Sequence, residues 1–412
     1  MRNLLFLVHR LPYPPNKGDK VRSYHLLRHL CAGHRVFLGT FIDDPEDEVH
    51  LAHLRSICPD VFVARIDPQV AKVRSLLGLA KDCALSLCYY RNAQLQAWVT
   101  QTLQDHTMDA VVVFSSVMAQ YVQGNPGADS PPLLVDFVDV DSAKWTQYAA
   151  SHRWPLSWLY RREGAQLLTY ERSVAARAQR SFFVTQNEAE LFQSMAPESA
   201  GRVLSMSNGV DVDYFSPLTA WPNPFRARRG PSGQMALVFT GAMDYWPNMD
   251  AVIWFVGEVL PQLLKRWPQL CFYIVGRSPP ACVVALASES VVVTGTVLDV
   301  RPYLQHASLV VAPLRVARGL QNKILEAMAM GRPVVASITC AQSIEANAGE
   351  LVRASGVGGF VAAIDRLLSA PARAAAIGQA ARQRVQKSYS WGAHLSGIDR
   401  YLTGAQPTGV HL

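Results

Sequence analysis

Short apolar segments alternate along the chain with longer stretches in which apolar and polar residues recur at helical spacing. The short segments lack the every-second-residue alternation of half-exposed strands, which is typical of parallel strands buried on both faces. In the first half of the chain we predict a helix near Val21–Cys31, a mostly helical middle, and strands at Asn3–Val8, Val36–Phe41, Ala110–Phe114, Leu133–Phe137 and Ser181–Thr185.

A second series of the same kind follows, with a helix at about Met249–Trp267 and strands at Ala236–Thr240, Leu270–Val275, Val291–Thr294, Leu309–Ala312 and Pro333–Ala336. The intervening stretch, Ser205–Gly233, is dense in Asn, Gly, Pro and Arg, which indicates a linker. We therefore expect a Rossmann-like N-terminal domain (1–205), a linker (206–233), a second Rossmann-like domain (234–385) and a C-terminal helix (386–412) that returns to the first domain. Two doubly wound α/β halves would place a ligand in the crevice at the carboxyl ends of their strands.

Composition narrows the class of protein. Half of the 412 residues are hydrophobic and 17% are charged, as in a well-buried globular protein, and the net charge of +7 favours anionic partners. No nucleic-acid-binding module is recognised, so nucleic acid is not expected as a partner. The seven cysteines form no C-x-x-C pair, and neither the N-terminal apolar run nor any later one has the length of a signal peptide or a membrane-spanning helix. We expect a cytoplasmic protein without a disulfide framework.

The most informative segment is Leu309–Ala336, in which a buried strand runs through a loop into a helix from about Asn322 to Met330. Gly331 ends this helix at its C′ position, and Asn322 is a plausible N-cap. The segment is unusually rich in polar residues for a loop between two buried elements.

Basic residues of this loop point to an anionic ligand. Arg315, Arg318 and Lys323 come near the N-terminus of the helix, where free N–H groups favour a diphosphate. Glu326 lies one turn further along, and its carboxylate can accept two hydrogen bonds from ribose hydroxyls. The alternative is an ordinary strand–loop–helix with surface salt bridges.

The same segment resembles the donor-binding signature of the retaining, GT-B fold glycosyltransferase family 4, written E-x7-E followed by A-M-A-x-G-x-P-V-V-A. Glu326 matches the second Glu of this signature, which binds the nucleotide ribose in the family, while Arg318 stands where the first Glu contacts the donor sugar. The family's basic pair after the first strand of the second domain is missing from the loop Gly241–Asp250, so we infer that Arg315, Arg318 or Lys323 supplies that charge. The resemblance implies a donor site made of Gly18, Gly241, Arg318, Gly319, Leu320, Asn322 and Glu326.

Two further motifs carry the resemblance. Ser207–Pro217 is similar to the N-G-V-D…F-x-P hallmark of the domain junction, and Pro12–Arg22 resembles the first-domain loop in which a glycine, here Gly18, lets backbone approach the donor phosphates. The alternative for the second motif is a strand-to-helix loop with solvated lysines. The opening His9–Asp19 and the run Val135–Trp145 resemble a branch associated with exopolysaccharide synthesis alongside exosortase systems.

Three interpretations remain for Asp139-Val-Asp141, which follows a predicted strand. Such a D-x-D holds a divalent metal in GT-A glycosyltransferases. Asp139 can instead lie near the sugar or the acceptor hydroxyl, in place of a family histidine, or the aspartates can cap the next helix. His9 is expected to be a structural residue at the end of a strand.

An acceptor can be expected near two stretches that combine cations with apolar residues, Ala71–Lys81 and His152–Arg162. Both could rest on an anionic membrane surface, and the alternative is a pair of amphipathic helices packed on the sheet.

These observations favour a retaining hexosyltransferase that uses a nucleotide-diphosphate sugar and a glycan or polyprenyl-linked acceptor in exopolysaccharide biosynthesis. The resemblance implies catalytic roles for Asp139, Arg315 and Lys323 without a metal or other cofactor. The protein would be cytoplasmic, with peripheral contact to the inner face of the plasma membrane. A GT-B-like nucleotide-sugar epimerase and a non-catalytic donor-binding protein remain the alternatives.

Overall fold

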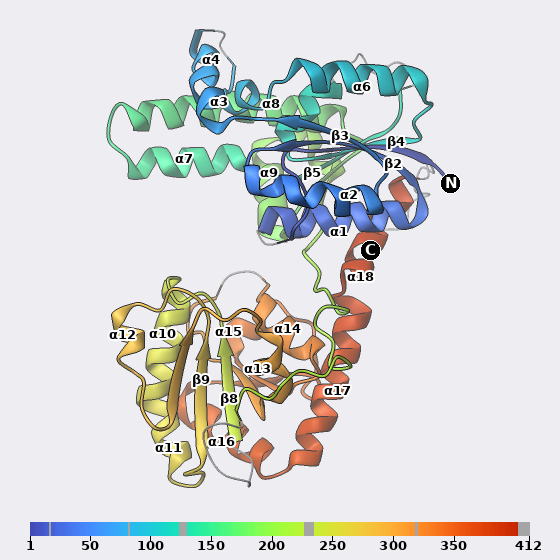
Figure 1. The fold of residues 1–412 in the computed structure, drawn as a ribbon. Helices are drawn as coiled ribbons and strands as arrows, with labels where there is room; N and C mark the ends of the chain where they lie inside the picture. The colour runs from blue at the N-terminus through green and yellow to red at the C-terminus, as the bar shows by residue number, and fades with distance from the viewer. Residues whose placement is uncertain (16–17, 81–82, 123–129, 226–234, 318–319, 403–412) are drawn as a thin grey trace. The chain divides into compact units, whose positions relative to one another are not determined.

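A computed structural model describes residues 1–15, 18–80, 83–122, 130–225, 235–317 and 320–402 (Figure 1). The chain divides into two compact units. Unit 1 comprises Met1–Asn208 with the C-terminal segment from His394, and unit 2 comprises Gly209–Ala393. Each unit is built on its own parallel sheet.

Unit 1 has a seven-stranded sheet in the order β3-β2-β1-β4-β5-β6-β7, in which every pairing is parallel. The order reverses between β1 and β4, which creates a topological switch point at their carboxyl ends. The strands are β1 (Asn3–Val8), β2 (Arg35–Ile42), β3 (Asp60–Arg65), β4 (Ala110–Phe114), β5 (Leu133–Val138), β6 (Arg180–Phe183) and β7 (Val203–Ser205).

The helices of unit 1 cover both faces of this sheet, with α1 and α2 on one face and α6 on the other (Figure 1). The α-helices are α1 (Gly18–Gly33), α2 (Leu51–Ile57), α3 (Pro68–Ser75), α4 (Leu77–Ala80), α5 (Leu85–Tyr89), α6 (Ala93–Asp105), α7 (Asp141–Ser151), α8 (Leu156–Arg177), α9 (Gln186–Met195) and α18 (Trp391–Leu402). Three short 3₁₀ segments complete the unit: η1 (Pro45–His50), η2 (Ser116–Val122) and η3 (Pro197–Arg202).

Unit 2 repeats the plan with a six-stranded parallel sheet, β10-β9-β8-β11-β12-β13, whose order reverses between β8 and β11. Its strands are β8 (Met235–Thr240), β9 (Leu270–Val275), β10 (Val291–Gly295), β11 (Leu309–Ala312), β12 (Val334–Ser337) and β13 (Val352–Ala354). The sheet lies between two layers of helices (Figure 1). They are α10 (Trp246–Trp254), the π-helical turn η4 (Phe255–Val259), α11 (Leu260–Leu264), α12 (Ala281–Val284), α13 (Arg301–His306), α14 (Asn322–Ala329), α15 (Ile338–Ala341), α16 (Gly356–Leu368) and α17 (Pro371–Ser388).

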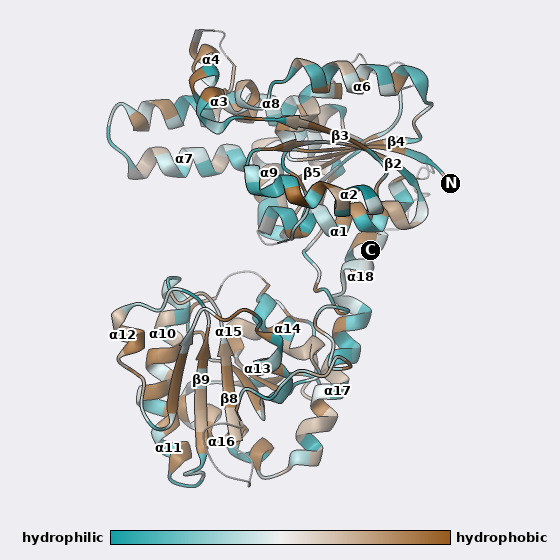
Figure 2. Ribbon diagram, viewed as in Figure 1, coloured by the Kyte–Doolittle hydropathy of each residue, from teal (hydrophilic) through white to brown (hydrophobic). Residues whose placement is uncertain are grey.

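Apolar strands form the centre of both units, as the hydropathy colours of Figure 2 show. The described part of the predicted linker is not free chain, because Val210 and Phe225 belong to the buried core of unit 2. Helix α14 ends as predicted: Gly331 has φ +67°, and the N–H groups of Gly331 and Arg332 donate to Met328 and Ala327.

The central strands match the sequence prediction, but three edge strands were missed. β3 and β7 are the edges of the first sheet and β13 is an edge of the second. The prediction of a mostly helical middle is wrong at β3, where four of the six residues are only half-buried. Edge strands are covered less completely, so their sequences lack the continuous apolar run that marks a buried strand.

Candidate functional site

The switch point of unit 2 brings two loops together. β8 and β11 are neighbours in the sheet, with Leu237 paired to Leu309, so the loops that follow them leave from adjacent positions. The first loop begins at Gly241 and the second leads into α14. Most of the predicted donor-site residues lie on these two loops and on the first turns of α14.

Lys323 connects the two loops. Its ammonium group donates a hydrogen bond to the Asn248 side chain and lies 4.4 Å from the centre of the Phe239 ring. A Cβ on Gly241 would come within 3.0 Å of the Lys323 Nζ and 2.8 Å of the Asn248 Nδ2, so glycine leaves room for this contact. Burial lowers the pKa of Lys323 to about 8, although Cys340 and Glu326 act in the opposite direction. The ammonium is therefore positioned by neutral groups rather than by a tight ion pair.

Glu326 lies one turn further along α14. The residue is half-buried, and burial raises the pKa of its carboxyl to about 7 even though Lys323 lowers it. Across the ranges that the structure describes, this carboxylate accepts no hydrogen bond and forms no ion pair. Both carboxylate oxygens are thus available to a ligand.

The first turn of α14 differs from its prediction in one respect. Gln321 is the N-cap residue and Asn322 is the exposed first residue of the helix, so the prediction that Asn322 caps the helix is wrong. No side-chain hydrogen bond from the N-cap residue closes this helix end. The backbone N–H groups of Asn322 and Lys323 can therefore serve an anion.

The other basic residues of the segment are placed differently from Lys323. Arg315 is largely exposed and forms a bidentate ion pair with Asp250 of α10. Leu320 is half-buried against the core of unit 2. The predicted site residues Arg318 and Gly319 lie outside the described residues.

In unit 1, Asp139 follows β5 at the carboxyl edge of the sheet. Lys144 donates to the carboxylates of both Asp139 (2.7 Å) and Asp141 (3.1 Å). Although burial works against it, the two carboxylates raise the pKa of Lys144. Both carboxylates of the D-x-D are thus paired with Lys144 of the same chain. The described residues contain no cluster of three or more His, Cys, Asp or Glu that could hold a metal.

The aspartates do not cap α7. Its N-cap residue is Val140, which makes no side-chain cap bond. Instead, the Val140 N–H donates to Glu188 at 2.7 Å, and the Ser142 hydroxyl donates to the buried Glu171. The capping interpretation of Asp139 and Asp141 is therefore wrong, because carboxylates from α8 and α9 occupy this helix end.

Gly18 is the first residue of α1, after the loop that follows β1. The alternative of solvated lysines in this segment is wrong for Lys20, which is buried and bonded to Asp47 at 2.6 Å. Two residues later, Arg22 is also buried and forms a bidentate pair with Asp136 of β5, at 2.7 and 3.2 Å.

His9 follows β1 and packs between aromatic rings, stacked on Phe114 and edge-on to Tyr90. Its Nε2 lies 3.6 Å from Asp19. These contacts agree with a structural role at the strand end.

Sequence reasoning missed Asn248 and Asp250, the partners of Lys323 and Arg315. Asn248 is buried, and Asp250 is two residues away on the same helix. Both are polar residues that follow the buried strand β8, and this could have marked them as candidates. Nothing in the sequence, however, pairs them with residues about 70 positions later.

The two cation-rich stretches lie side by side in unit 1 (Figure 1). Arg162 of α8 donates to the carbonyl of Gly78 in α4 at 3.0 Å, which ties the two helices together. The exposed apolar side chains of these two stretches include six that we call the α4–α8 surface: Leu76 (51%), Leu77 (58%), Leu79 (38%), Trp154 (80%), Leu156 (44%) and Trp158 (53%). None of the described helices is long and apolar enough to cross a membrane.

Comparison with known proteins agrees with this geometry. Residues 234–370 match the family Glycosyl transferases group 1. A GDP-mannose-dependent α-(1-6)-phosphatidylinositol monomannoside mannosyltransferase from Mycolicibacterium smegmatis is 27% identical over 213 residues, 48% of this chain and 55% of the relative. The similarity thus spans little more than half of that enzyme's length.

Solved structures resemble the whole chain. HepE from Anabaena in complex with UDP has a TM-score of 0.62 at 17% identity, covering 98% of this chain and all of that one. A glycosyltransferase from Rickettsia africae has a TM-score of 0.61 at 13% identity, covering 99% of each chain. The predicted GT-B fold of two Rossmann-like domains is confirmed, and the domain match in unit 2 indicates a glycosyltransferase.

Proposed function

We propose that this chain is a retaining glycosyltransferase of family 4 that moves a hexosyl group from a nucleotide-diphosphate donor to a glycan or polyprenyl-linked acceptor. The observation that carries the proposal is the Glu326 carboxylate, partly buried and without a protein partner across the described ranges, one turn from the start of α14 in the glycosyl transferases group 1 domain. A desolvated carboxylate left unpaired is unfavourable unless a ligand supplies donors, and two adjacent ribose hydroxyls do so.

The diphosphate is proposed to lie over the N-terminus of α14. There the backbone N–H groups of Asn322 and Lys323 and the Lys323 ammonium supply positive charge. The small Gly241 leaves space beside this ammonium. Arg315 would add positive charge at the exposed margin of this diphosphate site, because its guanidinium is already paired with Asp250.

In the reaction, the bond between the anomeric carbon and the diphosphate oxygen breaks and its electron pair goes to the leaving diphosphate. The acceptor oxygen forms the new bond on the same face of the sugar, and its proton passes to the leaving oxygen, so no strong protein base is needed. Lys323 and the helix N–H groups stabilise the charge that develops on the diphosphate. We propose that this needs no metal and that Gly18 and Asp139 supply the donor-phosphate and acceptor contacts of unit 1.

A direct test uses Glu326→Ala, with Glu258→Ala as control, because Glu258 is an exposed carboxylate of the same unit. Thermal stabilisation by UDP-, GDP-, ADP- and TDP-sugars identifies the nucleotide, since a ligand that binds only the folded state raises stability. Transfer of the labelled sugar should be lost in Glu326→Ala while the fold stays intact, and it should persist in Glu258→Ala. Near-normal transfer by Glu326→Ala would contradict the assignment, and product formed from the donor alone would instead indicate an epimerase.

We propose further that the acceptor is presented at a membrane, in exopolysaccharide biosynthesis, and that the α4–α8 surface contacts anionic lipid. Its exposed tryptophans and leucines lie beside Arg153, Arg161 and Arg162, and α7 and α8 carry no acidic residue between Asp141 and Glu163. Aromatic rings at headgroup level and arginines on phosphates are the usual elements of such contacts.

Vesicle sedimentation tests this contact. Trp154→Ser with Trp158→Ser should reduce binding to phosphatidylglycerol vesicles, whereas Leu218→Ser, which changes an exposed side chain of unit 2, should not. Equal binding by all three proteins, or equal binding to phosphatidylcholine, would rule out the proposed surface.

A further inference from the structure

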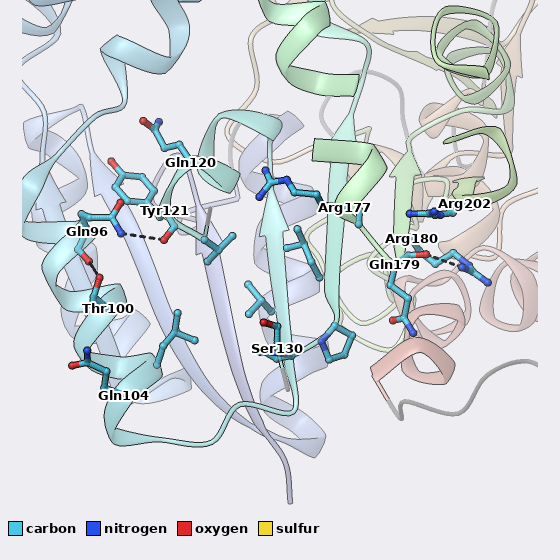
Figure 3. Close-up of a pocket in the computed structure, with 17 residues that line it drawn as sticks. Gln96, Thr100, Gln104, Gln120, Tyr121, Ser130, Arg177, Gln179, Arg180 and Arg202 are labelled. Carbon is cyan, nitrogen blue, oxygen red and sulfur yellow. Dashed lines mark hydrogen bonds between the residues drawn. The ribbon is translucent and has the colours of Figure 1, made fainter. Parts of the chain in front are cut away.

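Strand β5 ends irregularly at the carboxyl edge of the unit 1 sheet. Its first residue, Leu133, lines the pocket drawn in Figure 3, and from Leu134 to Asp136 the strand pairs in regular register with β6. Between Asp136 and Val138 the register shifts, which places one extra residue in β5. Irregularities of this kind change the direction of the side chains beside them, and Asp139 is the next residue.

Val138 has a backbone conformation that is unfavourable for its side chain. Its φ is +69°, and the Asp139 N–H donates to the Phe137 carbonyl at 2.9 Å, so the three residues form a γ-turn. A β-branched residue rarely takes a positive φ, and this form of the γ-turn is the strained one. Such strain persists only where surrounding contacts enforce it, and it is common at functional sites.

Contacts to Asp136 enforce this turn. Its carboxylate accepts a hydrogen bond from the Val138 N–H at 3.2 Å. The same carboxylate is fixed in orientation by its bidentate pair with Arg22, in which both side chains are 1% exposed. On the other side of the turn, the Val138 carbonyl accepts from the Val184 N–H at 2.7 Å. Arg22 thus acts on the turn through the Asp136 carboxylate.

The neighbouring strand β4 ends in a similar way. Ser115, the residue after β4, has φ +71° and donates its N–H to the Asp136 carbonyl at 2.8 Å. Two adjacent strands are therefore followed or ended by a residue with positive φ, and both of these residues are bonded to Asp136. Strand β4 also borders the switch point of this sheet, where ligands bind in sheets of this topology.

We propose that Arg22 and Asp136 are positioning residues for the acceptor. They hold Val138 in its strained turn, and the turn sets where the Asp139 carboxylate lies. This carboxylate is 31% exposed and is bonded to Lys144 at 2.7 Å, so it meets an acceptor hydroxyl in a fixed orientation. The inference rests on the proposed function of Asp139, but the turn itself can be tested without any reaction.

Hydrogen exchange of the full chain, measured by mass spectrometry over residues 137–140, tests the turn. Arg22→Met combined with Asp136→Leu removes the acceptor of the Val138 N–H, so exchange there should become about tenfold faster or more. Lys20→Met combined with Asp47→Leu is the matched control, because it removes another buried ion pair of α1, which joins η1 rather than β5. Arg22→Lys keeps a cation but not the bidentate contact, and it should give an intermediate rate in a folded protein.

Transfer of the labelled sugar tests the consequence, with glucose linked to farnesyl diphosphate as the acceptor probe. The Arg22→Met, Asp136→Leu variant should transfer about tenfold more slowly or less, because a small displacement of a catalytic group is costly. The loss should appear when the acceptor is varied, whereas the affinity for the nucleotide sugar, which we assign to unit 2, should not change. Val138→Gly added to this variant should restore part of the transfer, because glycine takes a positive φ without strain.

A pair that only holds the fold would behave differently. The proposal is overturned if the folded Arg22→Met, Asp136→Leu variant shows wild-type exchange over residues 137–140, or if it transfers sugar as well as the control variant. It is also overturned if Val138→Gly restores no transfer. Should that double variant not fold, Arg22→Lys decides, and wild-type exchange and transfer by it overturn the proposal. If the wild-type protein transfers no sugar, the proposed function fails, and the exchange measurement still decides whether the pair holds the turn.

Discussion

The two sheets differ in whether the charged side chains at the carboxyl ends of their strands form ion pairs. In unit 1, charges at this edge are paired with one another: Arg22 with Asp136, and Lys144 with both Asp139 and Asp141. In unit 2, Lys323 is held by a neutral amide and an aromatic ring, and Glu326 has no partner across the described ranges. The charges named at the unit 1 edge are thus paired. At the unit 2 edge Arg315 is paired with Asp250, but Lys323 and Glu326 form no ion pair within the described ranges.

We infer that the buried Arg22–Asp136 pair holds the fold, whereas Lys323 and Glu326 await a ligand. A buried ion pair with its hydrogen bonds made resists change, because removal of one partner leaves an uncompensated charge. A desolvated, unpaired group weakens the folded state, so its loss should affect binding more than stability. The predictions below test this contrast, from the largest expected effect to the smallest.

Breaking the Arg22–Asp136 pair should produce the largest effect. Both side chains are 1% exposed, so Asp136→Leu leaves a buried guanidinium without its counter-charge and should lower the free energy of unfolding by about 3–5 kcal/mol. Urea unfolding measures this loss. Nucleotide-sugar binding, which we assign to unit 2, should persist under conditions where the variant is folded.

A double variant sharpens this test. Arg22→Met combined with Asp136→Leu removes both charges and should restore much of the lost stability, since apolar replacement of a buried pair is often close to neutral. Arg172→Gln, which breaks an exposed pair with Glu198, should cost no more than about 1 kcal/mol. A double variant as unstable as Asp136→Leu would show that lost packing, rather than the unpaired charge, accounts for the effect.

Lys323→Met should show the reverse pattern in unit 2. Loss of a charged hydrogen bond to the diphosphate should weaken nucleotide-sugar binding by about 1.5–3 kcal/mol, roughly ten- to a hundredfold. Stability should be unchanged or slightly raised, because the variant no longer desolvates an ammonium. Calorimetric titration and thermal unfolding of the same sample measure both quantities, and a large loss of stability with normal binding would contradict the assignment.

The central strands and two residues of the unit 2 site could be predicted from the sequence. The continuous apolar runs of central strands such as Leu270–Val275 and Leu309–Ala312 match the structure to the residue, because burial on both faces leaves an unambiguous pattern. Glu326 and Lys323 were identified because polar residues cluster directly after such a strand. The edge strand β3 was missed because its half-exposed residues dilute that pattern.

The pairing of charges could not be predicted in the same way. Asp136 with Arg22 and Asp250 with Arg315 are contacts between residues far apart in sequence, and sheet order decides them rather than local pattern. Asp139 is an example. Its position after a strand was predicted, but its ion pair with Lys144 depends on the turn into α7.

The smallest expected effect is a pH dependence of donor binding. Burial raises the pKa of Glu326 to about 7 and lowers that of Lys323 to about 8. Binding that needs a carboxylate and an ammonium should therefore be tightest between about pH 7 and pH 8, and should weaken up to about tenfold per unit on either side. Calorimetric titration with a nucleotide sugar, whose diphosphate does not titrate in this range, measures the profile.

The same shifts predict the opposite trend in stability. The Glu326 contribution to the free energy of unfolding is fully present below its ordinary pKa of 4.5 and is lost as the pH rises through about 7. The Lys323 contribution is present above 10.5 and is lost as the pH falls through about 8. Both are thus diminished in the window where binding is tightest, as expected of charges kept for a ligand. Glu326→Gln should remove the acidic limb of the binding profile and Lys323→Met the alkaline limb; a flat profile in the wild type would mean that neither group titrates against the donor.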